Sequence, residues 1–388
     1  MQNFLAKSSG DTAKLVAQAK ALCGTDDKLW LLPPLVDLCA IPYGTLANAF
    51  ASESHAARQN GFLHLVVPPD SPEVLDNCSA IQELQSKARA QGVFVHALGA
   101  MTAELAGTAP ADMLALQQAG AIAVSNARAD MANDDVLLRA LEYAANFAIP
   151  VFFYPNESAL AKAGVAHDGF IATYQGLPAI ASVAETAAIA KQLLLIKHTN
   201  VRAHFSQLSC QNSVQLIREA KTEGLNVTCD VAMHQLHLTE NALIGFDTNA
   251  YVLPPLRSEQ DRQALLAGLQ DGTIDAICSH HTPLSLRDKF APFAEAIPGI
   301  SAFDTFMALG CKLVADGVLS AEQLVAKIAT NPASIAGIDA LWQSTGGAIV
   351  VDPNKTWQVT KDTLLSQGKN TPFLGERLQG KVVAVFFD

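Results

Sequence analysis

Paired cysteines and long apolar runs are missing from this sequence. Its seven cysteines are scattered and include no CxxC pair, which argues against a disulfide framework and against a thiolate zinc site. No apolar run approaches the ~20 residues that a membrane-spanning helix needs. The N-terminal stretch MQNFLAKSSGDTAKLVAQAK lacks the apolar block and the small-residue cleavage site of a signal peptide. These absences predict a cytoplasmic protein without a membrane anchor.

Positive charge is also scarce. The chain carries 26 Lys and Arg against 37 Asp and Glu, a net charge of −11, which argues against nucleic acid and against anionic membranes as partners. Charged residues make up only 16% of the 388 residues and hydrophobic residues 50%. A chain of this length and composition can bury a large core, in one large domain or two ordinary ones.

A regular alternation of short apolar runs and longer Ala/Leu-rich segments of helical period is present instead. Helix starts are marked by N-cap candidates such as Asn133 and Ser258. Eight strand–helix repeats predict a (β/α)8 TIM barrel over 31–335. A doubly wound open sheet is the alternative, but no GxGxxG follows any strand. The eight runs are 35–39, 62–69, 93–100, 121–126, 150–155, 201–208, 226–233 and 275–281.

Two further segments flank the predicted barrel. The N-terminal segment, 1–30, has a polar start and one amphipathic helix candidate, DTAKLVAQAKALC. The C-terminal segment, 336–388, contains GGAIVVDPNKTWQV and GKVVAVFFD, which are typical of strands. We therefore expect a small β appendage beside the barrel.

The C-terminal ends of the strands are where a barrel of this kind carries its functional side chains. A metal-dependent hydrolase needs about three ligands from His, Cys, Asp or Glu and a group that takes protons. These strand ends offer four histidines, one cysteine and only two carboxylates nearby. The candidate residues are Cys39, Ile41, Pro68, Pro69, Asp70, Asn126, Ala127, Arg128, Tyr154, Pro155, Asn156, Glu157, His204, Gln207, Met233, His234, Gln235, His280 and His281.

Each metal-ligand candidate also has a purely structural interpretation. Cys39 is typical of a small buried hydrophobe, and His204 of a hydrogen-bonded core histidine. His280 and His281 are adjacent, so at most one of them can point into the barrel mouth. A site built from Cys39, His204, His234 and His280 around one metal ion is the alternative. HQLH at 234–237 lacks the general base of an HExxH motif.

Three long segments carry a resemblance to a known family. They are SVQLIREAKTEGLNVTCDVAMHQLHLTE (213–240), YVLPPLRSEQDRQALLAGLQDGTIDAICSHHTPL (251–284) and KNTPFLGERLQGKVVAVFFD (369–388). Together they make the chain resemble bacterial dihydroorotases of the amidohydrolase superfamily, over almost all of the barrel and the C-terminal tail. The resemblance implies a metal-dependent hydrolase type of barrel. Because the family usually begins with several strands and this chain begins with a short, helical segment, we expect the appendage to be reduced.

The same resemblance shows what has been replaced. The family's metal-binding His-x-His pair falls at Cys39 and Ile41, and its strand-five and strand-six ligands fall at Tyr154 and Gln207. The family's strand-four ligand, an Asp or a carbamylated Lys, falls in the segment SNAR (125–128), which contains neither residue. Further replaced positions are the substrate-binding Arg and Asn, at Tyr43 and Pro69, and the catalytic Asp, at His280, with His281 matching the His beside it. We therefore assign no catalytic, cofactor-binding or metal-binding residue and expect no cofactor.

The resemblance points further, to the noncatalytic dihydroorotase-like subunits of certain bacterial aspartate carbamoyltransferases. It implies a pseudoenzyme in pyrimidine biosynthesis that assembles with the catalytic transferase chain, six of each, and supports its assembly and activity. One alternative is a divergent cyclic-amide hydrolase with a remodelled one-metal or metal-free site. Another is a standalone scaffold or homo-oligomer without a link to pyrimidine synthesis.

Overall fold

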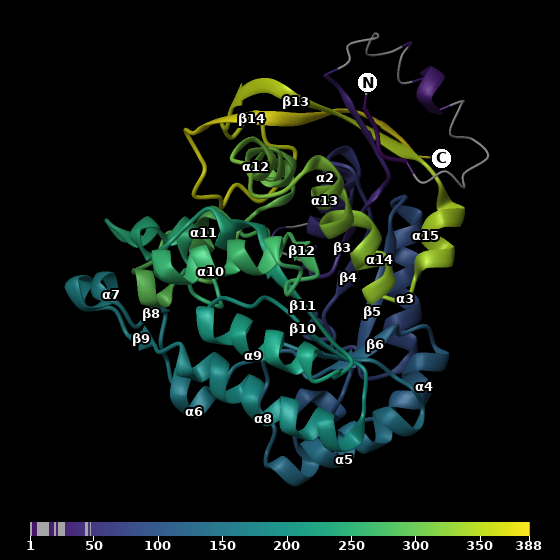
Figure 1. Cartoon of the computed structure of the whole chain (residues 1–388), viewed down its shortest axis with the longest axis vertical. Coiled ribbons are helices and arrows are strands. Elements are labelled where there is room, and N and C mark those ends of the chain that lie inside the picture. Colours follow the sequence, from purple (N-terminus) through teal and green to yellow (C-terminus); the bar gives the residue numbers. More distant parts are fainter. Residues whose placement is uncertain are drawn as a thin grey trace.

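Eight parallel strands form the central sheet of the chain (Figure 1). The computed structural model describes residues 2–5, 15–18, 21, 28–42, 46 and 48–387. In spatial order the strands are β3 (Leu35–Asp37), β4 (Phe62–Val67), β5 (Phe94–Ala100), β6 (Ala123–Ser125), β7 (Val151–Phe153), β10 (Ala203–Phe205), β11 (Val227–Ala232) and β12 (Ala276–Cys278). Each lies within one of the eight predicted runs, so the barrel prediction is confirmed and the open-sheet alternative is wrong.

The seam between β3 and β12 closes the barrel without a regular ladder. Ala40 and His281 form an isolated parallel bridge, and the amide of Ile41 donates to the His281 carbonyl at 2.8 Å. The buried carboxylate of Asp37 accepts hydrogen bonds from the backbone amide and the hydroxyl of Ser279. One carboxylate therefore links the first barrel strand to the last.

Helices pack around the barrel and follow its strands along the chain (Figure 1). Asn133 caps α5 by accepting from the amide of Val136, and Ser258 forms a capping box with Asp261 at the start of α10, as their sequence positions predict. The principal helices are α2 (Ala49–Gln59), α3 (Cys78–Ala90), α4 (Met113–Gln118), α5 (Asp134–Asn146), α8 (Val183–Thr199), α9 (Gln211–Thr222), α10 (Glu259–Gln270) and α12 (Phe303–Ala315).

An arm interrupts the repeat between β7 and α8. It spans residues 157–182 and contains two short helices and two short strands, which the sequence did not predict. At the end of the molecule in Figure 1 its helix α7 projects away from the barrel. The arm consists of α6 (Ser158–Ala161), β8 (Ala166–His167), α7 (Phe170–Gln175) and β9 (Ala179–Ile180).

A second, small sheet joins the two ends of the chain. Its strands are β1 (Gln2–Asn3), β2 (Trp30–Leu32), β13 (Ala348–Gln358) and β14 (Arg377–Phe386), in that spatial order. The C-terminal strands pair as the sequence predicts. The N-terminal part also supplies β1, which the prediction of a helical start did not include. Residues 15–18 are helical, and Leu15 and Val16 pack toward the sheet; the rest of the predicted N-terminal helix lies outside the described residues, apart from residue 21.

Shorter elements complete the C-terminal part of the barrel. They are α11 (Leu286–Lys289), α13 (Ala321–Val325), α14 (Asn331–Ile335) and α15 (Asp339–Thr345). Ala329, Ala333 and Ile335 belong to the same buried cluster as Phe152 and Cys278, so the barrel interior is filled by side chains. Within the described ranges, every helix is too short or too polar to span a bilayer.

The seam carboxylate Asp37 should make stability depend on pH in a recognisable direction. Burial raises the pKa of Asp37 from 3.8 to about 6, despite hydrogen bonds from Ser279 that lower it. Because the folded pKa lies above the unfolded one, the protonated acid favours the fold. That contribution is complete below pH 3.8 and is lost as the pH rises to about 6.

The free energy of unfolding of the unsubstituted chain, minus that of Asp37→Asn, should fall by about 2 kcal/mol between pH 4 and pH 7. Urea unfolding of both proteins at each pH measures this difference, in which the titration of all other groups cancels. A difference that does not change with pH would contradict the assignment.

Candidate functional site

Three neutral side chains meet at the barrel mouth, at positions where the sequence comparison placed lost ligands. The Nε2 of Gln207 donates to the Sγ of Cys39 at 3.0 Å, and the Tyr154 hydroxyl lies 3.7 Å from the same sulfur. All three side chains are buried. Burial raises the pKa of the Cys39 thiol far above its usual range, so the thiol stays protonated. A protonated thiol is neither a nucleophile nor a metal ligand.

The guanidinium of Arg128 adds a permanent positive charge to this group. It donates to the Oε1 of Gln207 and, at 2.9 Å, to the carbonyl of Leu253. Its Cζ atom lies 5.6 Å from the centre of the Tyr154 ring, in a cation–π contact. Arginine stays charged in proteins. The protein therefore holds a cation of its own beside Cys39, Tyr154 and Gln207.

His204 is a satisfied core histidine, as one interpretation of the sequence predicted. Its Nδ1 lies 2.8 Å from the Thr228 hydroxyl and its Nε2 3.0 Å from the Asp230 carboxylate. Asp230 also accepts from the backbone amide of Gln207 at 2.7 Å. The sequence analysis missed Asp230 as a member of this site. The alternation of Thr228, Asp230 and Ala232 along β11 is the signal that could have placed it inside the barrel.

His280 and His281 point to opposite sides, as predicted. His281 lies behind the barrel wall, where its Nε2 is 3.1 Å from the buried Glu53 carboxylate and its ring stacks on Phe303 with centroids 3.8 Å apart. His280 faces His234 in the mouth, with ring centroids 5.8 Å apart. Both nitrogens of His234 and the Nδ1 of His280 are buried without a hydrogen-bond partner.

The remaining candidates are dispersed around the rim or serve the fold. Asp70 is exposed at the end of β4, and Pro69 is buried. Asn126 accepts from the Thr102 hydroxyl, and Gln235 donates to the Pro254 carbonyl at 3.0 Å. Met233 belongs to the core. Tyr43, at the position of the family's substrate-binding Arg, lies outside the described residues.

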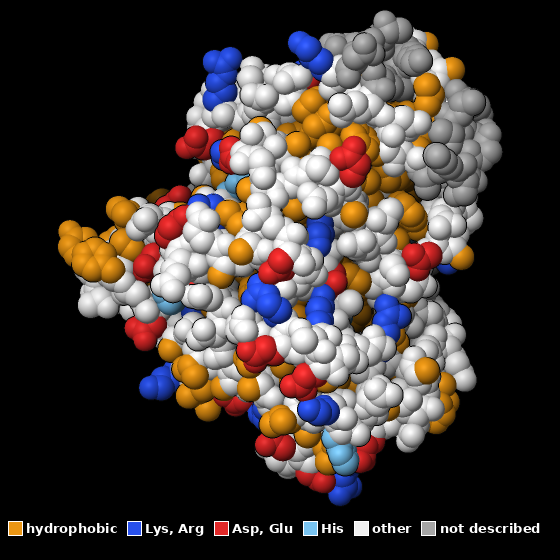
Figure 2. Space-filling view, viewed as in Figure 1, with side chains coloured by type: hydrophobic (Ala, Val, Ile, Leu, Met, Phe, Trp, Pro, Cys, Tyr) orange, Lys and Arg blue, Asp and Glu red, His pale blue; other side chains and the backbone are white. Residues whose placement is uncertain are grey.

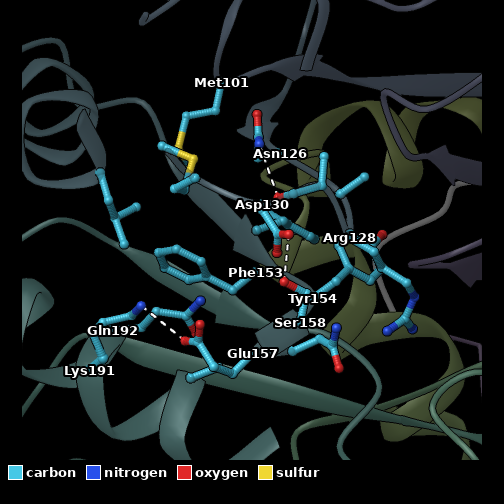
Figure 3. Close-up of a pocket in the computed structure, with 17 residues that line it drawn as sticks. Met101, Asn126, Arg128, Asp130, Phe153, Tyr154, Glu157, Ser158, Lys191 and Gln192 are labelled. Atoms are coloured by element: carbon cyan, nitrogen blue, oxygen red, sulfur yellow. Dashed lines mark hydrogen bonds and ion pairs between the residues drawn. The ribbon is translucent and has the colours of Figure 1, made fainter. Parts of the chain in front are cut away.

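A cavity of about 180 Å³ lies between the ends of β6 and β7 and the helices α5 and α8, and Arg128 and Tyr154 are among its lining residues (Figure 3). Its charged groups neutralise one another, since Lys191 pairs with Glu157 at 3.0 Å and with Asp134 at 3.2 Å. The Arg128 guanidinium lies away from this ion pair in Figure 3. The cavity therefore adjoins the Arg128 group at the mouth.

The backbone at the mouth is strained at three strand ends. Ala127, Gln207 and His280 have φ values of 48°, 61° and 52°, in the left-handed region that side chains other than glycine rarely adopt. Each such residue costs roughly 1–2 kcal/mol. Strain of this kind can mark functional sites, but Asn48, Ala148, Asn200 and other non-glycine residues away from the mouth have positive φ as well.

The side chains at the mouth do not fit a hydrolytic metal centre. Ile41 has no donor atom, Cys39 is held neutral, and His204 is occupied by Thr228 and Asp230. Only His234 and His280 of the four-residue alternative lack partners. Throughout the part of the chain that the structure describes, no three His, Cys, Asp or Glu side chains are grouped to hold a metal ion.

Solved structures share this architecture. An L-hydantoinase from Arthrobacter aurescens superposes with a TM-score of 0.80 at 21% identity, covering 92% of this chain and 84% of that one. The inactive dihydroorotase-like domain of a Chaetomium thermophilum CAD-like multifunctional protein superposes with a TM-score of 0.66 at 20% identity, covering 93% of each chain. The barrel with its small terminal sheet is thus a fold that this chain shares with a hydantoinase and a dihydroorotase-like domain.

Comparison with sequence relatives identifies the family to which the chain belongs. A family model described as dihydro-orotase-like matches residues 28–213. A dihydroorotase-like protein of Pseudomonas aeruginosa is 38% identical over 358 residues, or 90% of this chain and 84% of the relative. A dihydroorotase of Geobacter metallireducens is 36% identical over 383 residues, or 96% of this chain and 90% of the relative. The chain belongs to the dihydroorotase-like family.

Proposed function

We propose that this chain is a noncatalytic dihydroorotase-like subunit that supports the assembly and activity of aspartate carbamoyltransferase in pyrimidine biosynthesis. The observation that carries the proposal is the Arg128–Gln207–Cys39 contact network, which fills ligand positions with a cation, an amide and a neutral thiol. A metal-dependent hydrolase activates water near neutral pH with its bound metal ion. A guanidinium among the ligand positions opposes that route to the nucleophile.

The alternative, a divergent cyclic-amide hydrolase, rests on a different observation. His234 and His280 are buried and unpartnered at the mouth, so two imidazoles remain free for chemistry. A hydrolase would still need a third metal ligand or a general base beside them. Cys39 and His204 do not supply either, because one is protonated and the other is hydrogen-bonded at both ring nitrogens.

Exposed aromatic side chains on the arm support a role in assembly. Phe170 and Tyr174 on α7 are 74% and 77% exposed and stack with centroids 5.9 Å apart. Figure 2 shows apolar side chains gathered on this projecting end of the molecule. Exposed aromatic groups of this kind are typical anchors of protein interfaces. We assign the arm to the contact with the transferase chain.

Mixing the purified, tag-free chain with the catalytic chain of aspartate carbamoyltransferase tests the proposal. We expect the two to co-elute in size-exclusion chromatography as a complex of six plus six. We also expect less than a tenth of a zinc ion per chain and no interconversion of dihydroorotate and carbamoyl aspartate. The double variant Phe170→Ser/Tyr174→Ser should weaken co-elution. The control is Leu194→Ser, which changes a similarly exposed side chain (71%) on α8 and should leave co-elution unchanged.

The outcomes of this experiment separate the hypotheses. Dihydroorotase turnover that a chelator abolishes would establish the hydrolase alternative and overturn the proposal. Separate elution of the two chains would refute the proposed association with the transferase chain and would favour the hypothesis of a standalone scaffold. Unchanged co-elution of the arm variant would refute the arm as the contact surface while leaving the subunit function intact.

A further inference from the structure

A cavity of about 440 Å³ lies at the end of the barrel opposite to the mouth. It is bordered by α3, by the first residues of β5 and by the segment that leads into α15. Its walls are largely apolar and include Val95, Ile122, Ile338 and Leu341. Among the residues that line it only Arg89 carries a permanent charge, and that side chain is exposed. The volume falls within the range of roughly 300–1,000 Å³ that is typical of small-molecule sites.

A chain of hydrogen bonds runs from α15 to this cavity. The Thr345 hydroxyl donates to the Trp342 carbonyl at 3.0 Å, so its oxygen accepts from the Nε2 of His64 at 3.1 Å. Burial lowers the pKa of His64 to about 3 and that of His96 to about 4, so both rings are neutral near neutral pH. A neutral His64 that is protonated on Nε2 has an unprotonated Nδ1. The Nε2 of His96, 3.0 Å away, must therefore donate to that Nδ1.

The Nδ1 of His96 is the open end of the chain. Because the proton of His96 lies on Nε2, its Nδ1 is an acceptor, and none of the residues that the structure describes donates to it. His96 is 6% exposed and lines the cavity. The ring of His64 stacks on those of Phe94 and His96, with centroids 5.0 and 5.3 Å apart, which fixes the plane of the acceptor. Native structures seldom keep a buried acceptor without a donor.

We propose that this cavity binds a small, neutral ring compound that donates one N–H or O–H hydrogen bond to the Nδ1 of His96. The apolar walls remove the ring from water, and the single donor sets its orientation. A carboxylate or a phosphate dianion has acceptors only, and so it would meet the lone pair of His96 without a proton between them. The inference is independent of the proposed subunit function, because the cavity and the mouth lie at opposite ends of the barrel.

Nitrogen NMR on the full chain, uniformly labelled with ¹³C and ¹⁵N, tests the site. Indole is the probe, because it has one N–H donor, and benzothiophene is the matched control, a ring system of the same shape without a donor. We expect indole to move the Nδ1 resonance of His96 upfield, as a hydrogen bond does to an unprotonated imidazole nitrogen. Benzothiophene should compete with indole and cause no such shift. Correlations from the ring to the backbone assign the resonance, so the assignment needs no variant.

The variant His96→Phe keeps a ring of similar size and removes the acceptor. The affinity for indole divided by that for benzothiophene should fall about fivefold, because one neutral hydrogen bond is lost. The different hydration of the two ligands cancels in this ratio. The control is His198→Phe, which changes an exposed histidine in the last turn of α8 and should leave the ratio unchanged.

Two results would overturn the inference. In the first, the Nδ1 resonance of His96 does not respond to indole up to its solubility limit. In the second, the affinity ratio is the same in a folded His96→Phe protein as in the unsubstituted chain, which would make the cavity an apolar site without a preference for a donor. If His96→Phe does not fold, the unsubstituted chain decides. An indole-induced shift that benzothiophene reverses then supports the site, and a shift that it leaves in place refutes it.

Discussion

Histidines introduced at residues 39, 41 and 154 should bind zinc only when Arg128 is removed as well. The triple variant Cys39→His/Ile41→His/Tyr154→His restores three imidazoles, which is enough for a catalytic zinc site. Gln207 and Leu253 still hold the guanidinium beside them. At an effective dielectric constant of 20, a unit charge and a divalent ion 4 Å apart repel each other by roughly 8 kcal/mol, so we expect a loss of more than ten-thousandfold in zinc affinity.

Elemental analysis after equilibration with micromolar zinc measures this effect. We expect close to no zinc in the triple variant and about one ion per chain once Arg128→Ala is added. Arg218→Ala in the same triple background is the matched control and should leave the protein without zinc. A full complement of zinc in the triple variant with Arg128 in place would show that the guanidinium does not prevent metal binding at the mouth.

Glu53→Ala should be the most destabilising single substitution among these designs. The Glu53 carboxylate is fully buried and accepts hydrogen bonds from Ser366 and from the amide of Gln367, besides its contact with His281. Burial alone raises the pKa of Glu53, but the hydrogen bond and charge interaction with His281 reverse this, so the pKa lies below its usual value and the group is ionised. Alanine leaves its buried partners unpaired, and we expect a loss of about 3–5 kcal/mol.

Urea denaturation at pH 7 measures the loss as a lower midpoint at an unchanged slope. Glu83→Ala is the control, because Glu83 is 56% exposed and pairs with Lys87 four residues later on α3. An exposed pair of this kind contributes about 0.3–0.5 kcal/mol. Equal effects of the two substitutions would mean that the connection from α2 to the C-terminal tail does not stabilise the barrel.

The sequence predicted those parts of the fold that depend on local pattern. Apolar runs bounded by polar segments located all eight barrel strands, and N-cap residues such as Ser258 located helix starts. Adjacency alone placed His280 and His281 on opposite sides of their strand. The arm escaped prediction because its strands β8 and β9 have two residues each, too few to show an alternation.

The contacts that determine the site could not be predicted in this way. Arg128 meets Gln207 and Leu253 across 79 and 125 residues of sequence, and Glu53 meets Ser366 across 313. No periodicity relates positions so far apart. Asp37 sits in an apolar strand and gave no separate signal. Only the closed barrel shows that this carboxylate links the first strand to the last and that the Arg128 guanidinium contacts Gln207.

The seam between β3 and β12 also bears on the order in which the chain folds. Every other neighbouring pair in the barrel follows sequentially along the chain, so each can form as the next strand–helix unit arrives. The bridge from Ala40 to His281 must instead close a loop of most of the barrel's length, and such long-range contacts form slowly. We therefore expect an open, curled sheet to precede the closed barrel, with ring closure as the late step.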